Sequence, residues 1–355
     1  VAINNINIVS LVKNTNYIDF MKSDRLSQTG SIMFDASTFE YWGALLNGLT
    51  LYLIKKEVML NPIELSKYIR NNDITVMFIT SALFNQLVEY DASMFKNVRV
   101  LLTGGEILSV KHMNKVLKNC PNTKLYNVYG PTETTTFATF YKINDIFDKN
   151  IPIGKPLANK MCYIIDNKNR LLPIYAEGEL AIGGDGVAKG YIKREDLNST
   201  KFIFNQFSKN GKIYKTGDVS YFDNLGNVNF VCRIDNQIKI NGFRIELDEI
   251  KTKIINNDKI QDCYVFIKEN DGEKSIGVAY TVNDNEKISE DELKKYLTKD
   301  FPYYMVPKYF IEFNKLPLNK NGKVDGKKVK EVLDKKSENI KEQVSKENYS
   351  GIYLD

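Results

Sequence analysis

In the first 150 residues, short apolar runs alternate with segments whose apolar residues recur every three or four positions. These patterns predict strands at Ile74–Ile79, at Val98–Leu102 and from Lys124 onward, with helices between them at Leu83–Val88 and Val110–Leu117. Strands that alternate with helices form parallel βαβ units, and ligands bind beyond the carboxyl ends of such strands. Two polar segments, residues 104–106 and 129–136, directly follow predicted strands. We therefore expect a ligand site at this edge of a parallel sheet.

From about residue 151 the pattern changes to short strands separated by turn residues. Strands are predicted at Met161–Ile165, Gly178–Ile182 and Ser220–Phe222. Strands of this length with frequent turns are typical of antiparallel sheets. This part is therefore expected to be a small, antiparallel, barrel-like β subdomain.

The C-terminal part mixes both patterns. It predicts a strand near Ile238, a helix from Glu246, strands at Cys263–Ile267 and Ile276–Val282, and a helix at Glu290–Leu297. The segment from Lys327 to Asn348 is highly charged and lacks aromatic residues, which indicates a frayed helix or a linker. We expect an α/β fold with a large core at 1–234 (α/β subdomain 1–150, β subdomain 151–234), a smaller α+β domain at 235–330, whose mobility is implied only by the resemblance given below, and a tail at 331–355.

The composition narrows the classes of function. With 43% hydrophobic and 26% charged residues, the 355-residue chain has the make-up of a globular protein. It contains no apolar run of transmembrane length and no signal-peptide pattern, so we expect no membrane association and a cytoplasmic location. The formal charge is +5, and many lysines lie in the last fifty residues without interleaved aromatics. A solvated tail explains these lysines better than a nucleic-acid groove, so no nucleic-acid partner is expected.

The cysteine and histidine content argues against zinc sites, disulfide frameworks and histidine-dependent catalysis. The four cysteines lack Cys-x-x-Cys spacing, which argues against a zinc site or a disulfide framework. The single histidine, His112, lies in a polar segment with the pattern of a solvated helix. A Ser-His-Asp or Cys-His mechanism is therefore not expected.

The segment 127–136, with the sequence NVYGPTETTT, carries the strongest chemical signal. It combines an aromatic ring, a tight Gly-Pro turn, a row of hydroxyls and one carboxylate. Such a segment can hold a purine, donate hydrogen bonds to phosphate oxygens and place Glu133 on a magnesium ion. Hydroxyl-rich turns also occur in ordinary surface loops, so the segment alone is only suggestive.

Three further residues carry candidate chemistry, each with a structural alternative. Asp218, on the glycine turn of Tyr214–Asp218, can accept both hydroxyls of a ribose, although a strand-entry turn has the same sequence. Asp35 lies among aromatics and needs a partner, either a ligand ammonium or the amides of the helix it would cap, a role that Ser37 could also serve. Lys323, on a glycine-bearing loop, can act as a mobile point charge or be a solvated residue. The glycine-rich stretch 183–190 matches no phosphate-binding spacing and indicates a structural turn.

Taken together, these segments resemble the adenylation domains of nonribosomal peptide synthetases, in the adenylate-forming superfamily that also holds acyl-CoA ligases and luciferases. The resemblance runs from Val1 to about Lys330. It rests on seven segments in a fixed order: Phe34–Phe39, Asn127–Glu133, Gly178–Tyr191, Tyr214–Asp218, Arg233–Leu247, Phe301–Pro307 and Asn321–Asp325.

The resemblance implies a role for each matching residue. For the nucleotide, it implies that Tyr129 stacks on adenine, that Asn127 and Gly105 border its edge, and that Asp218, supported by Arg233, holds the ribose. For the reaction, it implies that Thr132 contacts the α-phosphate, that Glu133 binds Mg²⁺, and that Lys323 bridges the substrate carboxylate and the nucleotide. For the second step, it implies a hinge at Asp235 and a loop with Lys239 and Gly242 that faces the pantetheine channel.

The implied substrate is an α-amino acid, because Asp35 matches the residue that pairs with the α-ammonium. The positions that match the family's pocket lining are Asp35, Ala36, Phe39, Phe78, Leu102, Gly104, Val128, Thr136, Phe137 and Lys323. Since this lining is apolar apart from its two charges, an aliphatic branched side chain fits best, isoleucine first and then valine or leucine. One methylene discriminates by only about 1–3 kcal/mol, so relaxed selection is expected.

The resemblance further implies ATP as co-substrate, a phosphopantetheine thiol on a peptidyl carrier protein as acceptor, and a condensation domain elsewhere in a larger synthetase. The sequence begins where the family's phosphate loop ends, so this chain by itself is expected to adenylate poorly. Cys232, Asn241, Asp248 and Lys251 depart from the family pattern near the hinge. Two alternatives stay open: a non-catalytic scaffold of the same fold that binds a carrier protein or a nucleotide, and a carboxylate–CoA ligase.

Overall fold

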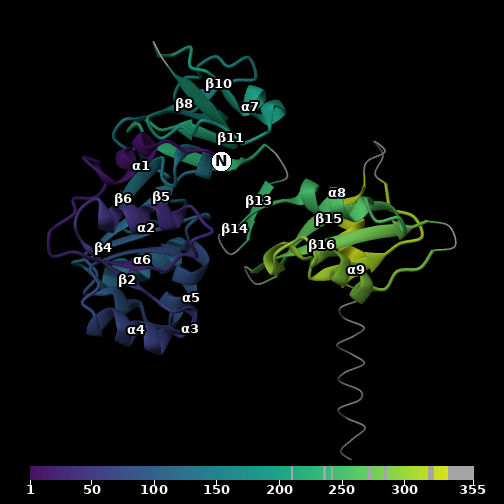
Figure 1. Ribbon diagram of the computed structural model, residues 1–355, viewed down its shortest axis with the longest axis horizontal. Coiled ribbons are helices and arrows are strands. Elements are labelled where there is room, and N and C mark those ends of the chain that lie inside the picture. Colours follow the sequence, from purple (N-terminus) through teal and green to yellow (C-terminus); the bar gives the residue numbers. More distant parts are fainter. Residues whose placement is uncertain are drawn as a thin grey trace, which may run out of the picture. The chain divides into compact units, whose positions relative to one another are not determined.

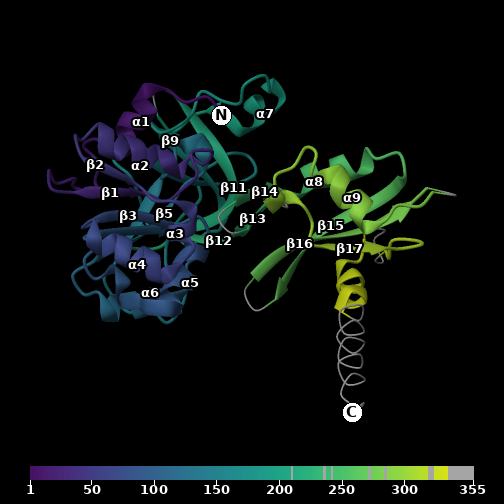
Figure 2. The same ribbon diagram turned by 60° about the horizontal axis from the view of Figure 1, so that its bottom comes forward.

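The computed structural model describes residues 1–208, 211–234, 237–240, 243–270, 273–283, 286–318 and 324–334. The chain divides into two compact units, residues 1–235 and residues 236–355. Figures 1 and 2 show the elements of each unit from two directions.

The first unit is built on a seven-stranded sheet with the strand order β2-β1-β3-β4-β5-β6-β7. Its strands are β1 (Arg25–Gln28), β2 (Thr50–Leu53), β3 (Val76–Thr80), β4 (Val100–Gly104), β5 (Lys124–Tyr129), β6 (Thr139–Ile143) and β7 (Lys155–Pro156). The neighbours from β2 to β5 pair in parallel, whereas β6 and β7 pair antiparallel. The predicted parallel βαβ part is therefore confirmed.

Helices cover both faces of this sheet, because its strands are apolar on both faces. They are α1 (Asn5–Val12), α2 (Ala36–Leu45), α3 (Lys56–Met59), α4 (Pro62–Asn71), α5 (Ser81–Asp91) and α6 (Val110–Asn119). In β3, Met77 and Ile79 pack into the cluster formed with α4, α5 and α6, whereas Val76 and Phe78 point to the opposite cluster with α1 and α2. Because both faces of the strand are buried, its sequence is a continuous apolar run rather than an alternation of apolar and polar residues.

A second sheet in the first unit is antiparallel, as predicted. It has the order β10-β11-β9-β8, with β12 on β11. The elements of this part are β8 (Lys160–Ile165), β9 (Gly178–Gly184), α7 (Glu195–Lys201), β10 (Phe202–Phe204), β11 (Lys212–Phe222) and β12 (Val228–Arg233). In the glycine-rich stretch, Gly184 and Gly190 have φ angles of 94° and 143°, in the region that side chains disfavour.

The segment Tyr214–Asp218 departs from its predicted place in a turn before a strand, because it lies inside β11. The strand accommodates the glycine through an irregularity: its register against β9 shifts between Lys215 and Val219, and Gly217 has a φ of 74°. Pairing with β9 on one side and β12 on the other outweighs the local turn signal. The bulge re-aims the side chain of Asp218, which follows it.

The second unit is a smaller α+β structure. It contains β13 (Gln237–Ile240), β14 (Phe243–Glu246), α8 (Leu247–Ile255), β15 (Ile260–Asn270), β16 (Glu273–Val282), α9 (Glu290–Leu297) and β17 (Tyr309–Glu312). The hydroxyl of Ser289 accepts a hydrogen bond from the amide of Glu292 at 3.1 Å, which caps α9. The bounds of α9 agree with the predicted helix, and the predicted α/β class as a whole is confirmed.

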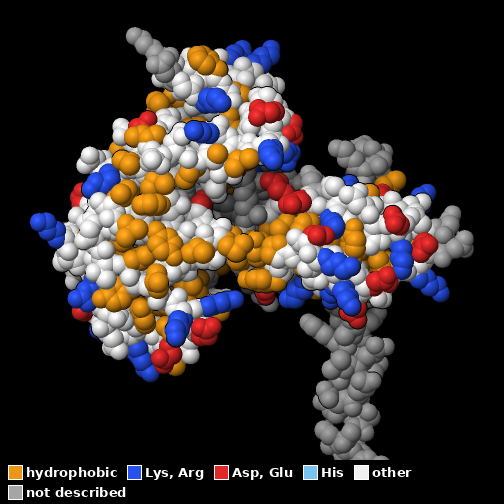
Figure 3. All heavy atoms as spheres, viewed as in Figure 1, with side chains coloured by type: hydrophobic (Ala, Val, Ile, Leu, Met, Phe, Trp, Pro, Cys, Tyr) orange, Lys and Arg blue, Asp and Glu red, His pale blue; other side chains and the backbone are white. Residues whose placement is uncertain are grey.

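The first unit also exposes large apolar side chains, visible as orange spheres in Figure 3. On α2 these include Trp42 and Leu45, with exposed fractions of 39% and 63%. Among the helices in the described ranges, none is long and apolar enough to cross a membrane.

Candidate active site

The loop that follows β5 brings a row of threonines to the carboxyl edge of the parallel sheet. After Tyr129 the chain forms a short 3-10 helix, Thr132–Thr134. Thr135 and Thr136 then have φ angles of 59° and 62°, a left-handed conformation that is unfavourable for branched residues. Strain at two adjacent threonines persists only where the surroundings hold the backbone firmly, and it is common at functional sites.

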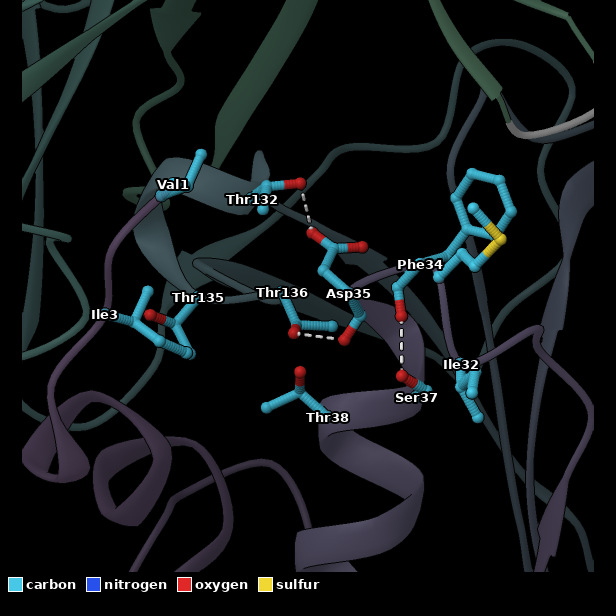
Figure 4. A pocket seen from close by; sticks show the side chains of 11 residues that line it. Val1, Ile3, Ile32, Phe34, Asp35, Ser37, Thr38, Thr132, Thr135 and Thr136 are labelled. Carbon is cyan, nitrogen blue, oxygen red and sulfur yellow. Dashed lines mark hydrogen bonds between the residues drawn. The ribbon is translucent and has the colours of Figure 1, made fainter. Parts of the chain in front are cut away.

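Asp35 meets this loop from the start of α2, as Figure 4 shows. The Thr132 hydroxyl donates to Asp35 Oδ2 at 2.7 Å, and the Thr136 hydroxyl donates to the Asp35 carbonyl oxygen at 2.7 Å. Asp35 occupies the N-cap position of α2, but its side chain makes no capping hydrogen bond. Its carboxylate is therefore directed toward the threonine loop rather than to the helix amides, which is the arrangement a ligand-binding carboxylate needs.

A pocket of about 230 Å³ lies at this junction. Its lining comes from the chain start, the segment before α2, α2 itself and the threonine loop: Val1, Ile3, Ile32, Met33, Phe34, Asp35, Ser37, Thr38, Thr132, Thr135 and Thr136. Of the predicted substrate residues, Asp35 and Thr136 line this pocket. Thr38, which is labelled below Asp35 and Thr136 in Figure 4, also lines the pocket and was not among the predicted residues.

Most other predicted pocket residues belong to the apolar cluster on the α1–α2 face of the sheet. Phe39, Phe78, Leu102, Val128 and Phe137 are all buried there, with Ala36 packed against them. Phe137 lies at the centre, with ring-centroid distances of 5.3 Å to Phe39 and 5.4 Å to Phe78. These side chains contact one another rather than line the open pocket.

Gly104, the last residue of β4, lies against the neighbouring strand. A β-carbon at this position would stand 2.0 Å from the Val128 carbonyl oxygen, so only glycine fits. Gly105, which follows, has a φ of 95°. Both glycines thus allow the chain to turn at the sheet edge beside the threonine loop.

Glu133 is a buried carboxylate, 3% exposed, held by a tyrosine. The Tyr191 hydroxyl donates to Glu133 Oε1 at 2.6 Å and lies 3.3 Å from the Tyr214 hydroxyl. Burial, and next the charge of Glu133, raise the pKa of Tyr191, so it stays a donor. Mg²⁺ is commonly bound by one or two carboxylates together with substrate phosphates, and Glu133 fits that single-carboxylate role. In the described part of the chain, no cluster of three or more acidic, histidine or cysteine residues could hold a metal by itself.

Asp218 joins the two sheets of the first unit. It is 6% exposed, and its carboxylate accepts hydrogen bonds from the Tyr129 hydroxyl on Oδ2 and from Arg233 on Oδ1, the latter at 2.6 Å. Arg233 also donates to the Thr216 carbonyl oxygen at 3.2 Å. Desolvation, and next the charge of Asp218, raise the pKa of Tyr129. The structure thus brings together three of the residues predicted to hold the nucleotide.

Asn127 lies on β5 two residues before Tyr129, with its side-chain amide donating to the Pro152 carbonyl oxygen at 2.8 Å. The predicted residues Asp235, Gly242 and Lys323 lie outside the described residues. Lys239 is on β13, opposite Arg244.

Sequence reasoning missed two buried charges near the site. Lys160, 4% exposed, donates from Nζ to the carbonyl oxygens of Thr134 and Thr135 at 2.8 and 3.3 Å and to that of Phe137. Burial lowers its pKa to about 7. The sequence did indicate that Lys160 faces inward, because it alternates along the strand with Cys162 and Ile164, whose side chains pack into one apolar cluster.

The second missed charge is Glu40 on α2, with an exposed fraction of 0%. It accepts hydrogen bonds from the amide and hydroxyl of Thr29, both at 2.8 Å, and from the amide of Gly30. Burial raises its pKa to about 7. Glu40 therefore fixes the start of the segment that leads to Asp35.

Comparisons with known proteins agree with this geometry. The model of a family described as AMP-binding enzyme matches residues 1–192, and that of the AMP-binding enzyme C-terminal domain matches residues 249–323. Gramicidin S synthase 2 of Brevibacillus brevis is 44% identical over 320 residues, which are 90% of this chain and 7% of that protein. Bacitracin synthase 3 of Bacillus licheniformis is 46% identical over 323 residues, 90% of this chain and 5% of that protein.

Among solved structures, holo-PA1221, an NRPS protein containing adenylation and PCP domains, is similar with a TM-score of 0.82 at 30% identity. The similarity covers 91% of this chain and 56% of that chain. The chain thus spans a small part of the length of the synthases that it matches. It belongs to the family of AMP-binding enzymes, as an adenylate-forming ligase domain of the nonribosomal peptide synthetase type.

Proposed function

We propose that this chain activates an aliphatic α-amino acid as its aminoacyl adenylate, with isoleucine first and valine or leucine next, and passes it to a carrier-protein thiol. The observation that carries this proposal is the pocket where the Asp35 carboxylate and the Thr132 and Thr136 hydroxyls meet. A carboxylate at a small pocket gives an α-ammonium its counter-charge. The threonine hydroxyls supply donors for the oxygens of a phosphate.

The nucleotide end of the proposed site is Tyr129, Asn127 and the Asp218–Arg233 pair. The ribose hydroxyls would donate to Asp218, and Arg233 keeps that carboxylate charged and fixed through its 2.6 Å contact. The ring of Tyr129, anchored by its own hydroxyl on Asp218, offers a face for the purine.

In the proposed reaction, the amino-acid carboxylate attacks the α-phosphorus of ATP in line, and pyrophosphate leaves. The protein forms no covalent bond, so its contribution is orientation and charge stabilisation. Asp35 holds the ammonium and Thr132 donates to the α-phosphate, while Lys323 supplies a cation to both reacting groups. Mg²⁺ on Glu133 would neutralise phosphate charge.

An aliphatic side chain is proposed because the apolar cluster that holds Phe39 and Phe137 adjoins the pocket, whose lining includes their chain neighbours Thr38 and Thr136. A second charged group on the substrate would find no counter-charge among these rings. In the second step, the pantetheine thiol of a peptidyl carrier protein displaces AMP and gives a thioester. We further propose a condensation domain in the same synthetase, a cytoplasmic location and domain boundaries near residues 150, 234 and 330.

ATP–pyrophosphate exchange with each of the twenty amino acids tests the proposal. It is measured on the full-length protein. We expect isoleucine, valine or leucine to support exchange. Asp35→Asn should abolish exchange, whereas the control Asp73→Asn, at a side chain 77% exposed, should leave it unchanged.

Lys323→Ala in the full-length protein should abolish adenylate formation and leave ATP binding largely intact. If no amino acid stimulates exchange while a carrier protein still binds, the proposal is contradicted in favour of a non-catalytic scaffold. Activation of carboxylic acids without an α-amino group would favour a carboxylate–CoA ligase.

A further inference from the structure

We infer that Lys160 is a positioning residue for the amino-acid end of the site, because its ammonium holds the backbone of the threonine loop in the shape that the pocket requires. This inference rests on the proposed function. The Lys160 side chain is not part of the pocket lining; it acts through the carbonyl oxygens of Thr134, Thr135 and Phe137.

The number of donors matches the number of acceptors. A lysine ammonium has three N–H groups and no acceptor, and three carbonyl oxygens from four consecutive residues converge on it. Fixing three carbonyls of one turn fixes the peptide planes between them. The loop needs such restraint, since Thr135 and Thr136 both have left-handed backbone conformations that are strained for branched residues.

The restrained peptides carry the pocket hydroxyls. Thr136, inside the segment that Lys160 holds, donates to the Asp35 carbonyl oxygen, and Thr135 donates to the Gly186 carbonyl oxygen at 2.9 Å. If the carbonyls lose their common donor, the threonines can relax toward ordinary φ angles, and the Thr136 contact with Asp35 breaks. The position of Asp35 and the shape of the pocket therefore depend on a lysine behind the loop.

An ion pair does not explain the burial of the Lys160 ammonium in the described part of the chain. Within the described ranges, no carboxylate forms an ion pair with Lys160, and the titratable group that acts on it is the Cys162 thiol. Burying an ammonium is expensive unless its hydrogen bonds are complete. Burial lowers the pKa of Lys160 to about 7, because it disfavours the charged form. The three carbonyl oxygens of the threonine loop complete the hydrogen bonds of this ammonium.

Gly186 lies against the Lys160 ammonium, so a substitution at Gly186 can test the role of Lys160 separately. A β-carbon on Gly186 would stand 2.3 Å from Lys160 Cε, 2.6 Å from Nζ and 2.8 Å from the Thr134 carbonyl oxygen. Gly186→Ala therefore displaces the lysine tip without removing the lysine. It should reproduce the effect of Lys160→Met on the threonine loop.

Calorimetric titration of this chain with two ligands tests the inference. The first ligand is a non-hydrolysable sulfamoyl adenosine that carries isoleucine, valine or leucine, and the second is AMP. Lys160→Met and Gly186→Ala should each weaken the aminoacyl ligand about tenfold, a change of about 1.4 kcal/mol in binding free energy, and change AMP affinity less than twofold. The control Lys168→Met, at an exposed turn of the same sheet, should change neither affinity.

Three other results would overturn either the positioning role of Lys160 or the proposed function. Equal weakening of both ligands, or loss of the fold in both variants as judged by circular dichroism, would mean that Lys160 supports the domain as a whole. Unchanged binding of the aminoacyl ligand in both variants would refute the positioning role and leave the proposed function standing. A wild-type chain that binds neither ligand would refute the proposed function, and the inference with it.

Discussion

Replacing Arg233 by methionine should destabilise the first unit strongly, because it leaves a buried carboxylate without its cation. The side chains of Asp218 and Arg233 are 8% and 16% exposed, and their contact is 2.6 Å long. Removing one partner of a buried ion pair typically costs about 3–5 kcal/mol. Since the Tyr129 hydroxyl still donates to Asp218 in the variant, we expect the lower end of that range.

A loss of about 3 kcal/mol lowers the ratio of folded to unfolded protein by more than about a hundredfold. It is a large share of the roughly 5–15 kcal/mol that stabilises a typical domain. Urea unfolding can resolve this, because Trp42, the single tryptophan of the chain, lies on α2 of the first unit. Its fluorescence reports on that unit and gives the free energy of unfolding by linear extrapolation.

A double variant separates the charge from the packing. Asp218→Asn combined with Arg233→Met should be more stable than the sum of the two single effects predicts, because no uncompensated charge remains. The control Arg194→Met removes an exposed partner of Asp196 and should leave the urea midpoint unchanged. Equal midpoints for Arg233→Met and this control would refute the reasoning, since they would mean that Asp218 is solvated.

Three further variants test other parts of the site. Burial raises the pKa of Glu40 to about 7, so the folded state binds an extra proton between about pH 4.5 and 7, and the wild type should lose up to about 3 kcal/mol of stability as the pH rises through that window. Glu40→Gln should flatten this pH dependence in urea titrations at pH 4.5 and 8. Parallel pH profiles of stability for the wild type and the variant would disprove it. Gly104→Ala should lower thermal stability by at least about 1–3 kcal/mol, because its new β-carbon overlaps the Val128 carbonyl oxygen; an unchanged melting temperature would show that the strands can separate at no cost. Tyr191→Phe removes the donor to buried Glu133 and should cost about 1–3 kcal/mol in urea unfolding, so a variant as stable as the wild type would mean that water replaces the hydroxyl.

The sequence predicted the sheet and its edge well, because both depend on local periodicity. The predicted strand at Ile74–Ile79 is β3, offset by one or two residues, and the predicted helix at Val110–Leu117 is α6 with two more residues at its end. Parallel strands bring their carboxyl ends to one edge whatever their distance in sequence. That rule is why residues 104–106 and the loop at 129–136 could be expected to meet, whereas the place of Asp35 beside this loop was implied only by the family resemblance.

Prediction failed where partners distant in sequence decide the local structure. Tyr214–Asp218 has the composition of a turn, but strands on both sides keep it extended. Glu40 looks like a surface charge in the sequence, and the strand alternation of Lys160 shows that it faces inward but not what it binds. Both residues bind backbone groups 10 to 26 residues away. Ligand roles of Phe39 and Phe137 rested on family resemblance, since a buried aromatic in the sequence does not reveal whether it faces a cavity or a neighbouring ring.

The hydrogen bond from Thr132 to Asp35 has a consequence for the order of events in the proposed reaction. A threonine hydroxyl has one proton, so it can serve Asp35 or a phosphate oxygen, but not both. An incoming ammonium would take over the carboxylate and release that proton toward the nucleotide. A competing acid without an amino group would leave the proton where it is, so recognition of the substrate and readiness for attack would be coupled through a single rotating O–H bond.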